Sequence, residues 1–183
     1  MEKTSASAST RKSAKAQPQD AIAILSADHR KVEALFEQYE ALKESGDPDE
    51  KAALAARICL ELTVHAKVEE EIFYPAAREA IEDEDLMDEA EVEHASAKDL
   101  IAQLSESDPD DDLFDAKVKV LGEYIEHHVK EEEGEMFAKA KKAKLDIAAL
   151  GVEIEARKDA LMAELADDIE VEQTPTARGR TSR

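Results

Sequence analysis

HAKVEEEIFYP, at residues 65–75, is repeated in altered form as HVKEEEGEMF at residues 128–137. In each copy a glutamate follows the histidine by four residues, and a second acid and bulky apolar residues come after it. On an α-helix, residues four apart lie on one face, about 6 Å apart along the axis. Two such pairs on facing helices would bring two imidazoles and two carboxylates together, a ligand set suited to a pair of metal ions. The repeat therefore predicts a metal-binding helical bundle.

The composition agrees with a helical fold and narrows the classes of partner. A length of 183 residues is enough for one domain with a full core. Charged residues make up 38% and aromatic residues only 4%, which favours helix over sheet. The net charge of −21 would repel the phosphates of nucleic acids and of anionic membranes, so we predict no nucleic-acid partner and no membrane partner.

Cysteine content and hydropathy bear on the cellular location. The single cysteine, Cys59, excludes a disulfide framework and cysteine-based zinc sites. The sequence contains neither an apolar run long enough to span a membrane nor a signal peptide. These features predict a cytoplasmic protein.

Apolar residues recur every three or four positions in four long segments and predict an all-α, up-down-up-down four-helix bundle. The first segment covers about residues 20–45, and the second begins at Asp47-Pro48, where an N-cap precedes a proline at the first helical position. Pro75 should kink or end this second helix. The third begins near the acidic residues 82–85. Asp108-Pro109 repeats the cap-and-proline pattern before the fourth.

Two tails and a further helix complete the predicted organisation. Residues 1–19 and 168–183 have little to bury and are predicted to be disordered tails around a bundle domain at 20–142. Residues 143–167 predict an additional C-terminal amphipathic helix, which could cover the bundle or form a homodimer interface.

Inward positions of the four bundle helices hold polar residues that an apolar core would not need. The candidate metal ligands at these positions are His29, His65, Glu69, His94, His128 and Glu132. The register favours His128 over His127, although Val120 and Tyr124 keep the row of His127 partly apolar. A single inward histidine is most often an ordinary core residue, but here each of the four helices has one.

The two inward glutamates strengthen the metal hypothesis. Glu69 and Glu132 stand where Leu or Ile would be expected, and burying an unpaired carboxylate costs several kcal/mol. Either water or a cation should therefore reach them. Four histidines and two glutamates make two sets of two imidazoles and one carboxylate, which suits ferrous iron with open coordination positions. The ferritin-like pattern differs, because Glu91-x-x-His94 has no second copy.

These motifs resemble the hemerythrin-like HHE cation-binding family over about residues 20–140. The resemblance rests on Asp28-His29, the two His-x-x-x-Glu motifs with the apolar residues after them, and Glu93-His94. It implies the hemerythrin bundle around a non-haem di-iron centre with an oxo or hydroxo bridge. The implied ligands are the six candidates above, and the two glutamates would bridge two iron ions.

The chain departs from the oxygen-carrying members of that family at two positions. Lys98 stands where those members have a second histidine on the third helix, and Glu132 follows His128 by four residues rather than five. The implied pocket therefore has one nitrogen fewer. We expect a di-iron protein that binds or senses oxygen or a related small molecule, and we hold two alternatives open. One is a di-iron enzyme acting on hydrogen peroxide or nitric oxide, and the other is a metal-free helical interaction protein.

Three further residues are candidates for positions around the centre. Tyr124 lies one turn before His128 and Glu61 one turn before His65, so each could orient an imidazole. Lys98 could donate a hydrogen bond to a bound anion or extend outward to solvent.

Overall fold

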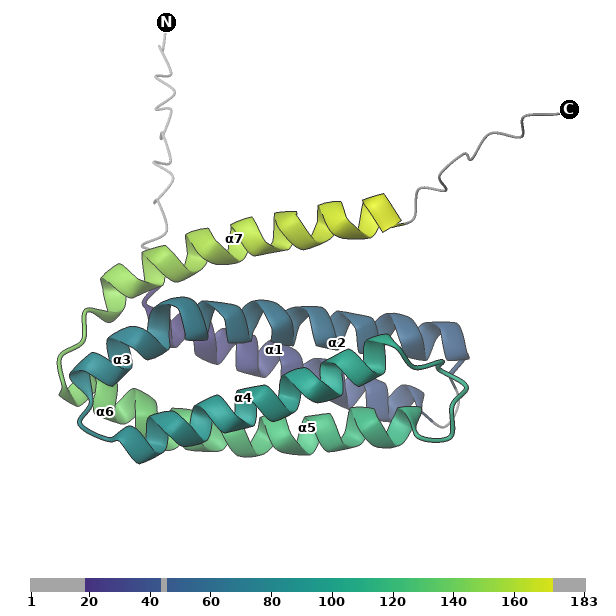
Figure 1. Ribbon diagram of the computed structural model, residues 1–183, viewed down its shortest axis with the longest axis horizontal. Helices are drawn as coiled ribbons and strands as arrows, with labels where there is room; N and C mark the ends of the chain where they lie inside the picture. Colours follow the sequence, from purple (N-terminus) through teal and green to yellow (C-terminus); the bar gives the residue numbers. More distant parts are fainter. Residues whose placement is uncertain (1–18, 44–45, 173–183) are drawn as a thin grey trace, which may run out of the picture.

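The computed structural model describes residues 19–43 and 46–172, with side chains up to residue 165. Most of the two predicted tails, residues 1–18 and 173–183, lies outside the described residues. The described part contains the predicted four-helix bundle and the additional C-terminal helix (Figure 1). The bundle consists of α1 (Ala21–Leu42), α2 (Pro48–Val68) with its continuation α3 (Tyr74–Ala80), α4 (Glu84–Ser105), and α5 (Phe114–Glu131) with its continuation α6 (Phe137–Lys142).

Two π-helical turns join the continued helices. The turn η1 (Glu69–Phe73) connects α2 to α3, and η2 (Glu132–Met136) connects α5 to α6. Each turn begins at one of the two inward glutamates. Single π turns inside α-helices are rare and are frequently found at functional sites.

Side-chain caps explain where several helices begin. Asp20 accepts a hydrogen bond from a backbone N–H of the first turn of α1, and Asp83 does the same for α4. Asp47 caps α2 by accepting from the N–H of Asp49, and Pro48 is the first helical residue, as predicted. The second predicted cap is wrong. Residues 108–114 form two consecutive turns, and α5 begins only at Phe114, without a side-chain cap.

Two apolar clusters fill the bundle, and a polar layer separates them. One cluster contains Leu25, Val68, Phe73 and Met87 and lies toward α3, α6 and α7 (Ile147–Glu172). The other contains residues toward the opposite end, including Cys59, Leu62, Leu104 and Leu121. The inward histidines fall between the clusters along every bundle helix. Cys59 is a buried core residue, as expected of a lone cysteine.

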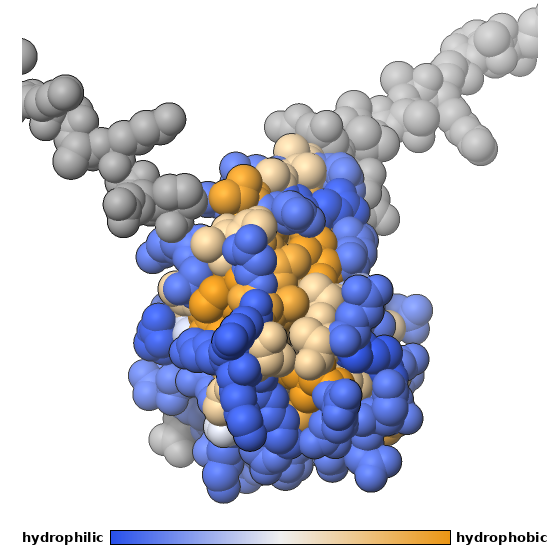
Figure 2. All heavy atoms as spheres, turned by 90° about the vertical axis from the view of Figure 1, so that its left-hand side faces the viewer, coloured by the Kyte–Doolittle hydropathy of each residue, from blue (hydrophilic) through white to orange (hydrophobic). Residues whose placement is uncertain are grey.

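The helix α7 lies along the bundle and packs against α1, α2 and η1 (Figure 1). Its buried residues Ile154 and Leu161 join the first apolar cluster. At Gly151 it approaches α1 so closely that an added Cβ would lie 2.8 Å from the backbone nitrogen of Ala21. Figure 2 shows apolar side chains gathered between α7 and the bundle below it, framed by hydrophilic ones. Within the described residues, no helix combines the length and hydropathy needed to cross a membrane.

Candidate metal centre

The structure brings all six predicted ligand residues together in the polar layer. The four histidines come from α1, α2, α4 and α5, and each is at most 6% exposed. Glu69 is 0% exposed and Glu132 is 1% exposed. The register prediction for the fourth helix is correct: His128 is buried, whereas the side chain of His127 is 60% exposed and lies beside Glu93 and Glu131 on the surface.

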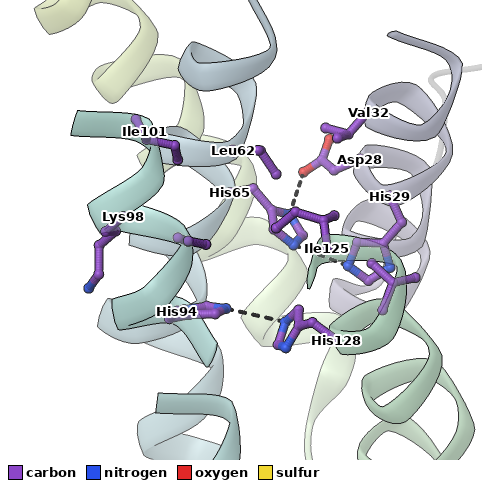
Figure 3. Close-up of a pocket in the computed structure, with 13 residues that line it drawn as sticks. Asp28, His29, Val32, Leu62, His65, His94, Lys98, Ile101, Ile125 and His128 are labelled. Carbon is purple, nitrogen blue, oxygen red and sulfur yellow. Dashed lines mark hydrogen bonds and ion pairs between the residues drawn. The ribbon is translucent and has the colours of Figure 1, made fainter. Parts of the chain in front are cut away.

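The ligand atoms form two sets that share one glutamate. Potential donor atoms of His29, His65, Glu69 and Glu132 all lie within 4.8 Å of one another, and those of Glu69, His94 and His128 form a second such group. The Nε2 atoms of His29 and His65 are 3.1 Å apart, and those of His94 and His128 are 3.2 Å apart. Figure 3 shows the two pairs of rings facing each other across the interior.

The carboxylates fit between these imidazole pairs. Glu69 places Oε1 3.0 Å from His65 Nε2 and Oε2 3.3 Å from His94 Nε2, so it reaches both sets. Glu132 places Oε2 3.2 Å from His29 Nε2. Glu69 therefore has the position of a bridging ligand, and Glu132 lies closest to the set formed by His29 and His65.

Four further acids face the outer nitrogens of the histidines. Glu133 is 2.8 Å from His29 Nδ1, Glu70 is 2.9 Å from His94 Nδ1, Glu93 is 2.8 Å from His128 Nδ1, and Asp28 is 3.5 Å from His65 Nδ1. An ionised carboxylate only accepts hydrogen bonds, so each Nδ1 carries the proton in the neutral ring. Each Nε2 then directs a lone pair into the interior, which is the orientation that a metal-ligating imidazole needs.

The acids follow the pseudo-repeat of the sequence. Each half of the repeat has a helix with a single inward histidine (α1 or α4), followed by a helix with the His-x-x-x-Glu motif. The acid just before the single histidine, Asp28 or Glu93, faces the histidine of the following helix. The acid just after each inward glutamate, Glu70 or Glu133, faces the lone histidine of the other half. Each of these four acids is a sequence neighbour of a candidate ligand, but a register that sorts residues only into inward and outward faces does not predict their contacts.

The predicted orienting residues are wrong. Tyr124 is 49% exposed, and Glu93 occupies the position at His128 Nδ1. Glu61 pairs with Lys31 at 2.6 Å, since Asp28 faces His65. The prediction assumed that a residue one turn earlier on the same helix would contact the imidazole. In the structure, the Nδ1 atoms of these histidines instead face acids from other helices.

Of the two roles predicted for Lys98, the structure shows the outward one: its side chain is 53% exposed and pairs with an acid there. Its Nζ lies 2.8 Å from Oε1 and 3.0 Å from Oε2 of Glu70, the acid that faces His94. In Figure 3 its side chain extends away from the imidazoles.

Tyr74 is a polar residue of the site that the sequence did not single out. Its hydroxyl oxygen lies 3.1 Å from His94 Nε2 and 3.3 Å from His128 Nε2. Burial raises the pKa of Tyr74 well above its usual value, and the charges of Glu69 and Glu132 raise it further. The phenol therefore keeps its proton and can donate it to a lone pair at the second ligand set. Its signal in the sequence was the aromatic residue five positions after Glu69.

The surroundings of the two inward carboxylates, Glu69 and Glu132, indicate whether this site suits cations. The four carboxylate oxygens of Glu69 and Glu132 are buried and accept no well-directed hydrogen bond from the described residues. Burial raises the pKa of Glu132, and the charge of Glu69 raises it further. Burial also disfavours the charge of Glu69, but His65 and His94 outweigh it and hold its pKa well below the usual value. Buried carboxylates without well-directed hydrogen bonds are costly, so the donor set fits metal ions, which would compensate the charges of both glutamates.

The pKa of His65 shows how strongly the site favours positive charge. Burial alone would lower this pKa, but Glu69 and the hydrogen bond with Asp28 outweigh burial and raise it to about 10. The surroundings therefore stabilise a cation at this place, whether a proton or a metal ion.

A small cavity borders the four imidazoles, and Asp28 is part of its lining. Its volume is about 20 Å³, and its apolar walls include Val32, Leu62, Ala97, Ile101 and Ile125. This is room for one molecule of about the size of water. Figure 3 shows Ile125 beside the histidine rings. The cavity thus offers an apolar chamber for a small ligand next to the candidate metal positions.

Comparisons with known proteins agree with this geometry. The family model described as hemerythrin HHE cation binding domain matches residues 20–140. A curated relative from Nostoc sp. (strain PCC 7120), named DNA nickase, is 32% identical over 115 residues, which are 63% of this chain. The chain spans only 32% of that relative's length. A crystal structure of a hemerythrin HHE cation binding domain-containing protein, the Rv2633c homologue from Mycobacterium kansasii, superposes with a TM-score of 0.70. It is 20% identical, and the match covers 88% of this chain and 95% of that one, which shows a shared fold.

Proposed function

Because the chain belongs to the hemerythrin HHE cation-binding domain family, we propose that it is a cytoplasmic non-haem di-iron protein that binds or senses dioxygen or a related small molecule. The observation that carries this proposal is the convergence of the inner nitrogens of four imidazoles on two buried carboxylates, whose oxygens accept no well-directed hydrogen bond from the described residues. The proposed ligands are the six residues predicted from the sequence. The two glutamates would bridge the ions, as the resemblance implies, and of the two, Glu69 contacts histidines of both sets. Ferrous ions bound there would supply electrons and open coordination positions for a small ligand.

The protein's own residues would prepare the site for that ligand. The acids at the four Nδ1 atoms hold the rings in the tautomer that points Nε2 inward. The apolar walls of the small cavity limit access of water, and the cavity volume limits the ligand to a few atoms. Tyr74 can donate its hydroxyl proton to a polar atom held beside His94 and His128.

Anaerobic reconstitution tests the proposal. The protein is loaded with ferrous iron, freed of excess metal, assayed for iron, and then exposed to air. We expect about two irons per chain and new near-ultraviolet and visible absorption after oxidation. His128→Ala should lose iron, whereas His127→Ala, which changes the exposed neighbouring residue, should retain it. Failure of the wild-type protein to retain iron would end the proposal.

An enzyme acting on hydrogen peroxide or nitric oxide is the second candidate function, and Tyr74 favours it. A buried proton donor at the ligand site can assist reactions in which a bound oxygen atom takes up a proton. Reconstituted protein should then consume peroxide or nitric oxide faster than the same concentration of free iron. Tyr74→Phe should lower this rate at least tenfold without loss of iron. An equal rate in the two proteins would assign Tyr74 a packing role only.

The name of the Nostoc relative raises DNA nicking as a further activity. The net charge of −21 opposes contact with the DNA backbone, so we propose no nucleic-acid partner for this chain. A supercoiled plasmid incubated with the reconstituted protein checks this directly. Conversion to open circles beyond that caused by free iron would reverse the conclusion.

We retain the homodimer through the C-terminal helix as a separate proposal. The exposed apolar residues Val152 and Met162 of α7 support it, whereas Ile154 and Leu161 are already buried in the chain's own core. Val152→Glu should shift the sedimentation coefficient from dimer to monomer. A wild-type protein that sediments as a monomer at high concentration would exclude this interface.

A further inference from the structure

A lysine of α7 touches the metal centre through an acid on α1. Lys158 Nζ lies 2.5 Å from Oδ1 and 2.6 Å from Oδ2 of Asp28. The Oδ2 atom of Asp28 faces His65 Nδ1 at 3.5 Å. Lys158 and Asp28 are 130 residues apart, and Lys158 lies beyond the residues that the family model matches. A helix outside the matched domain thus contributes a charge next to a candidate metal ligand.

This contact breaks the pseudo-symmetry of the centre. Asp28 and Glu93 are counterparts, since each precedes a lone histidine and faces the histidine of the next helix. Asp28 is held by a lysine, but Glu93 meets the exposed His127 at 3.5 Å instead. Glu93 approaches His128 Nδ1 to 2.8 Å, whereas the corresponding distance for Asp28 is 3.5 Å. The two ion positions therefore differ in the surroundings of His65 and His128.

The chemistry of the contact defines what Lys158 does. The side chain of Asp28 is only 14% exposed, and its contact with His65 Nδ1 is long, so without Lys158 its charge would favour rotation toward solvent. A lysine that contacts both oxygens holds the carboxylate in one rotamer and offsets part of its charge. An acid behind a ligating histidine fixes the ring's orientation and its proton, and its loss typically costs 10–100-fold in metal affinity.

We propose that Lys158 is a positioning residue of the metal centre, which holds Asp28 toward His65 and makes the two ion positions inequivalent. The inference rests on the proposed metal-binding function. It extends the centre to α7 through this one contact, so that loss of the contact alters binding at the ion position formed by His29 and His65 and leaves the position formed by His94 and His128 unaffected.

Cobalt(II) titration tests the proposal, because this ion accepts nitrogen and oxygen ligands and has a visible spectrum sensitive to coordination. The full-length wild type, Lys158→Met and Lys158→Arg are titrated in competition with a chelator, and two binding steps are resolved. In Lys158→Met one step should weaken about tenfold and its visible bands should shift, while the other step stays within about twofold. Lys158→Arg should restore the wild-type values, since a guanidinium can hold the same carboxylate.

Arg157→Met is the matched control. Arg157 joins α7 to the bundle through Glu71, with Nε 2.7 Å from Oε2, but does not touch an acid that faces a histidine. It should lower the melting temperature about as much as Lys158→Met and leave both cobalt affinities unchanged. The proposal is overturned if Lys158→Met changes neither step, weakens both equally, tightens one, or is matched by Arg157→Met. A wild type that binds no cobalt would instead refute the metal-binding function itself.

Discussion

At the scale of single residues, the two inward glutamates have the same place in the repeat but different electrostatic roles. Glu69 contacts two imidazoles, whereas Glu132 contacts one and lies in the field of Glu69. In the metal-free protein, Glu69→Gln should therefore lower the free energy of unfolding by about 2 kcal/mol or more, because it leaves charged histidines unpaired. Glu132→Gln should leave it unchanged or raise it by about 1 kcal/mol, since it removes a disfavoured charge.

Urea unfolding in the presence of a chelator measures this difference. Both variants should also bind less iron than the wild type, so iron content by itself cannot separate them. Equal destabilisation by the two substitutions would contradict the assignment of the stabilising charge to Glu69.

Proton release is the second expectation at this scale. The pKa of His65 is raised to about 10 in the metal-free fold, against about 6.5 in an unfolded chain. The stabilisation from protonated His65 is thus fully present below about pH 6.5 and is lost as the pH rises through about 10. At pH 7 the folded metal-free protein carries this proton, and a metal ion must displace it because it binds only the neutral ring.

Calorimetry in two buffers of different ionisation enthalpy measures the released protons. We expect at least about one proton per chain at pH 7 and an affinity that increases as the pH rises toward 10. His127→Ala should release the same number, because the exposed ring lies outside the centre. Heats of binding that do not depend on the buffer would contradict the raised pKa.

How far the sequence predicts the site is clearest from the residues around His65. The inward residues His65 and Glu69 were predictable because the 3.6-residue period separates buried from exposed faces. The role of Asp28 was not, since it depends on the distance between two helices rather than on a position within one. Tyr74 was missed for a related reason, because its inward direction depends on the π turn before it.

At the scale of elements, the π turns are the feature that the periodic pattern could not predict. A prediction from a 3.5- or 3.6-residue period assumes a constant rotation per residue. The turns η1 and η2 break this assumption, because each adds a wider turn that begins four residues after the inward histidine. The Tyr74 N–H bonds to the carbonyl of Glu69, five residues earlier. Pro75 follows directly, where its missing N–H has the least effect on the restarting α-helix. The predicted kink is thus a π turn that precedes the proline.

Two glycines on helical elements should respond in opposite ways to alanine. Gly134 lies in η2, and an added Cβ would meet no atom of the described residues within 4 Å. Gly134→Ala should stabilise the protein by about 0.5–1 kcal/mol, because alanine restricts the unfolded chain more than glycine does. Gly151 lies where α7 meets the start of α1, and Gly151→Ala should destabilise the protein by about 1–3 kcal/mol through the clash at Ala21.

Thermal unfolding of the two variants checks the pair, and each serves as the control of the other. A loss of stability in Gly134→Ala would mean that η2 needs glycine for its backbone. An unchanged Gly151→Ala would mean that α7 is not packed against the start of α1.

At the scale of the whole molecule, the bundle holds a polar layer between two apolar clusters, inside a protein of net charge −21. The architecture was predictable because the periodicity of each helix and the cap at Asp47 agree with one another. The packing of α7 was left open, since an amphipathic face alone does not say which surface it covers. The structure shows that the apolar face of α7 covers α1 and α2 of its own bundle.

Removal of metal should therefore change the stability of the whole molecule. An ion that binds only the folded state at a hundred times its dissociation constant adds about 2.7 kcal/mol, so two ions add about 5 kcal/mol. For a domain of this size that corresponds to an increase in melting temperature of about 10–20 °C. Calorimetric scans with ferrous iron under nitrogen and with a chelator measure the difference. The double variant His65→Ala/His128→Ala should show no response to either. A wild-type melting temperature that is the same in iron and in chelator would favour the metal-free helical interaction protein, because the buried carboxylates would then be stable without cations.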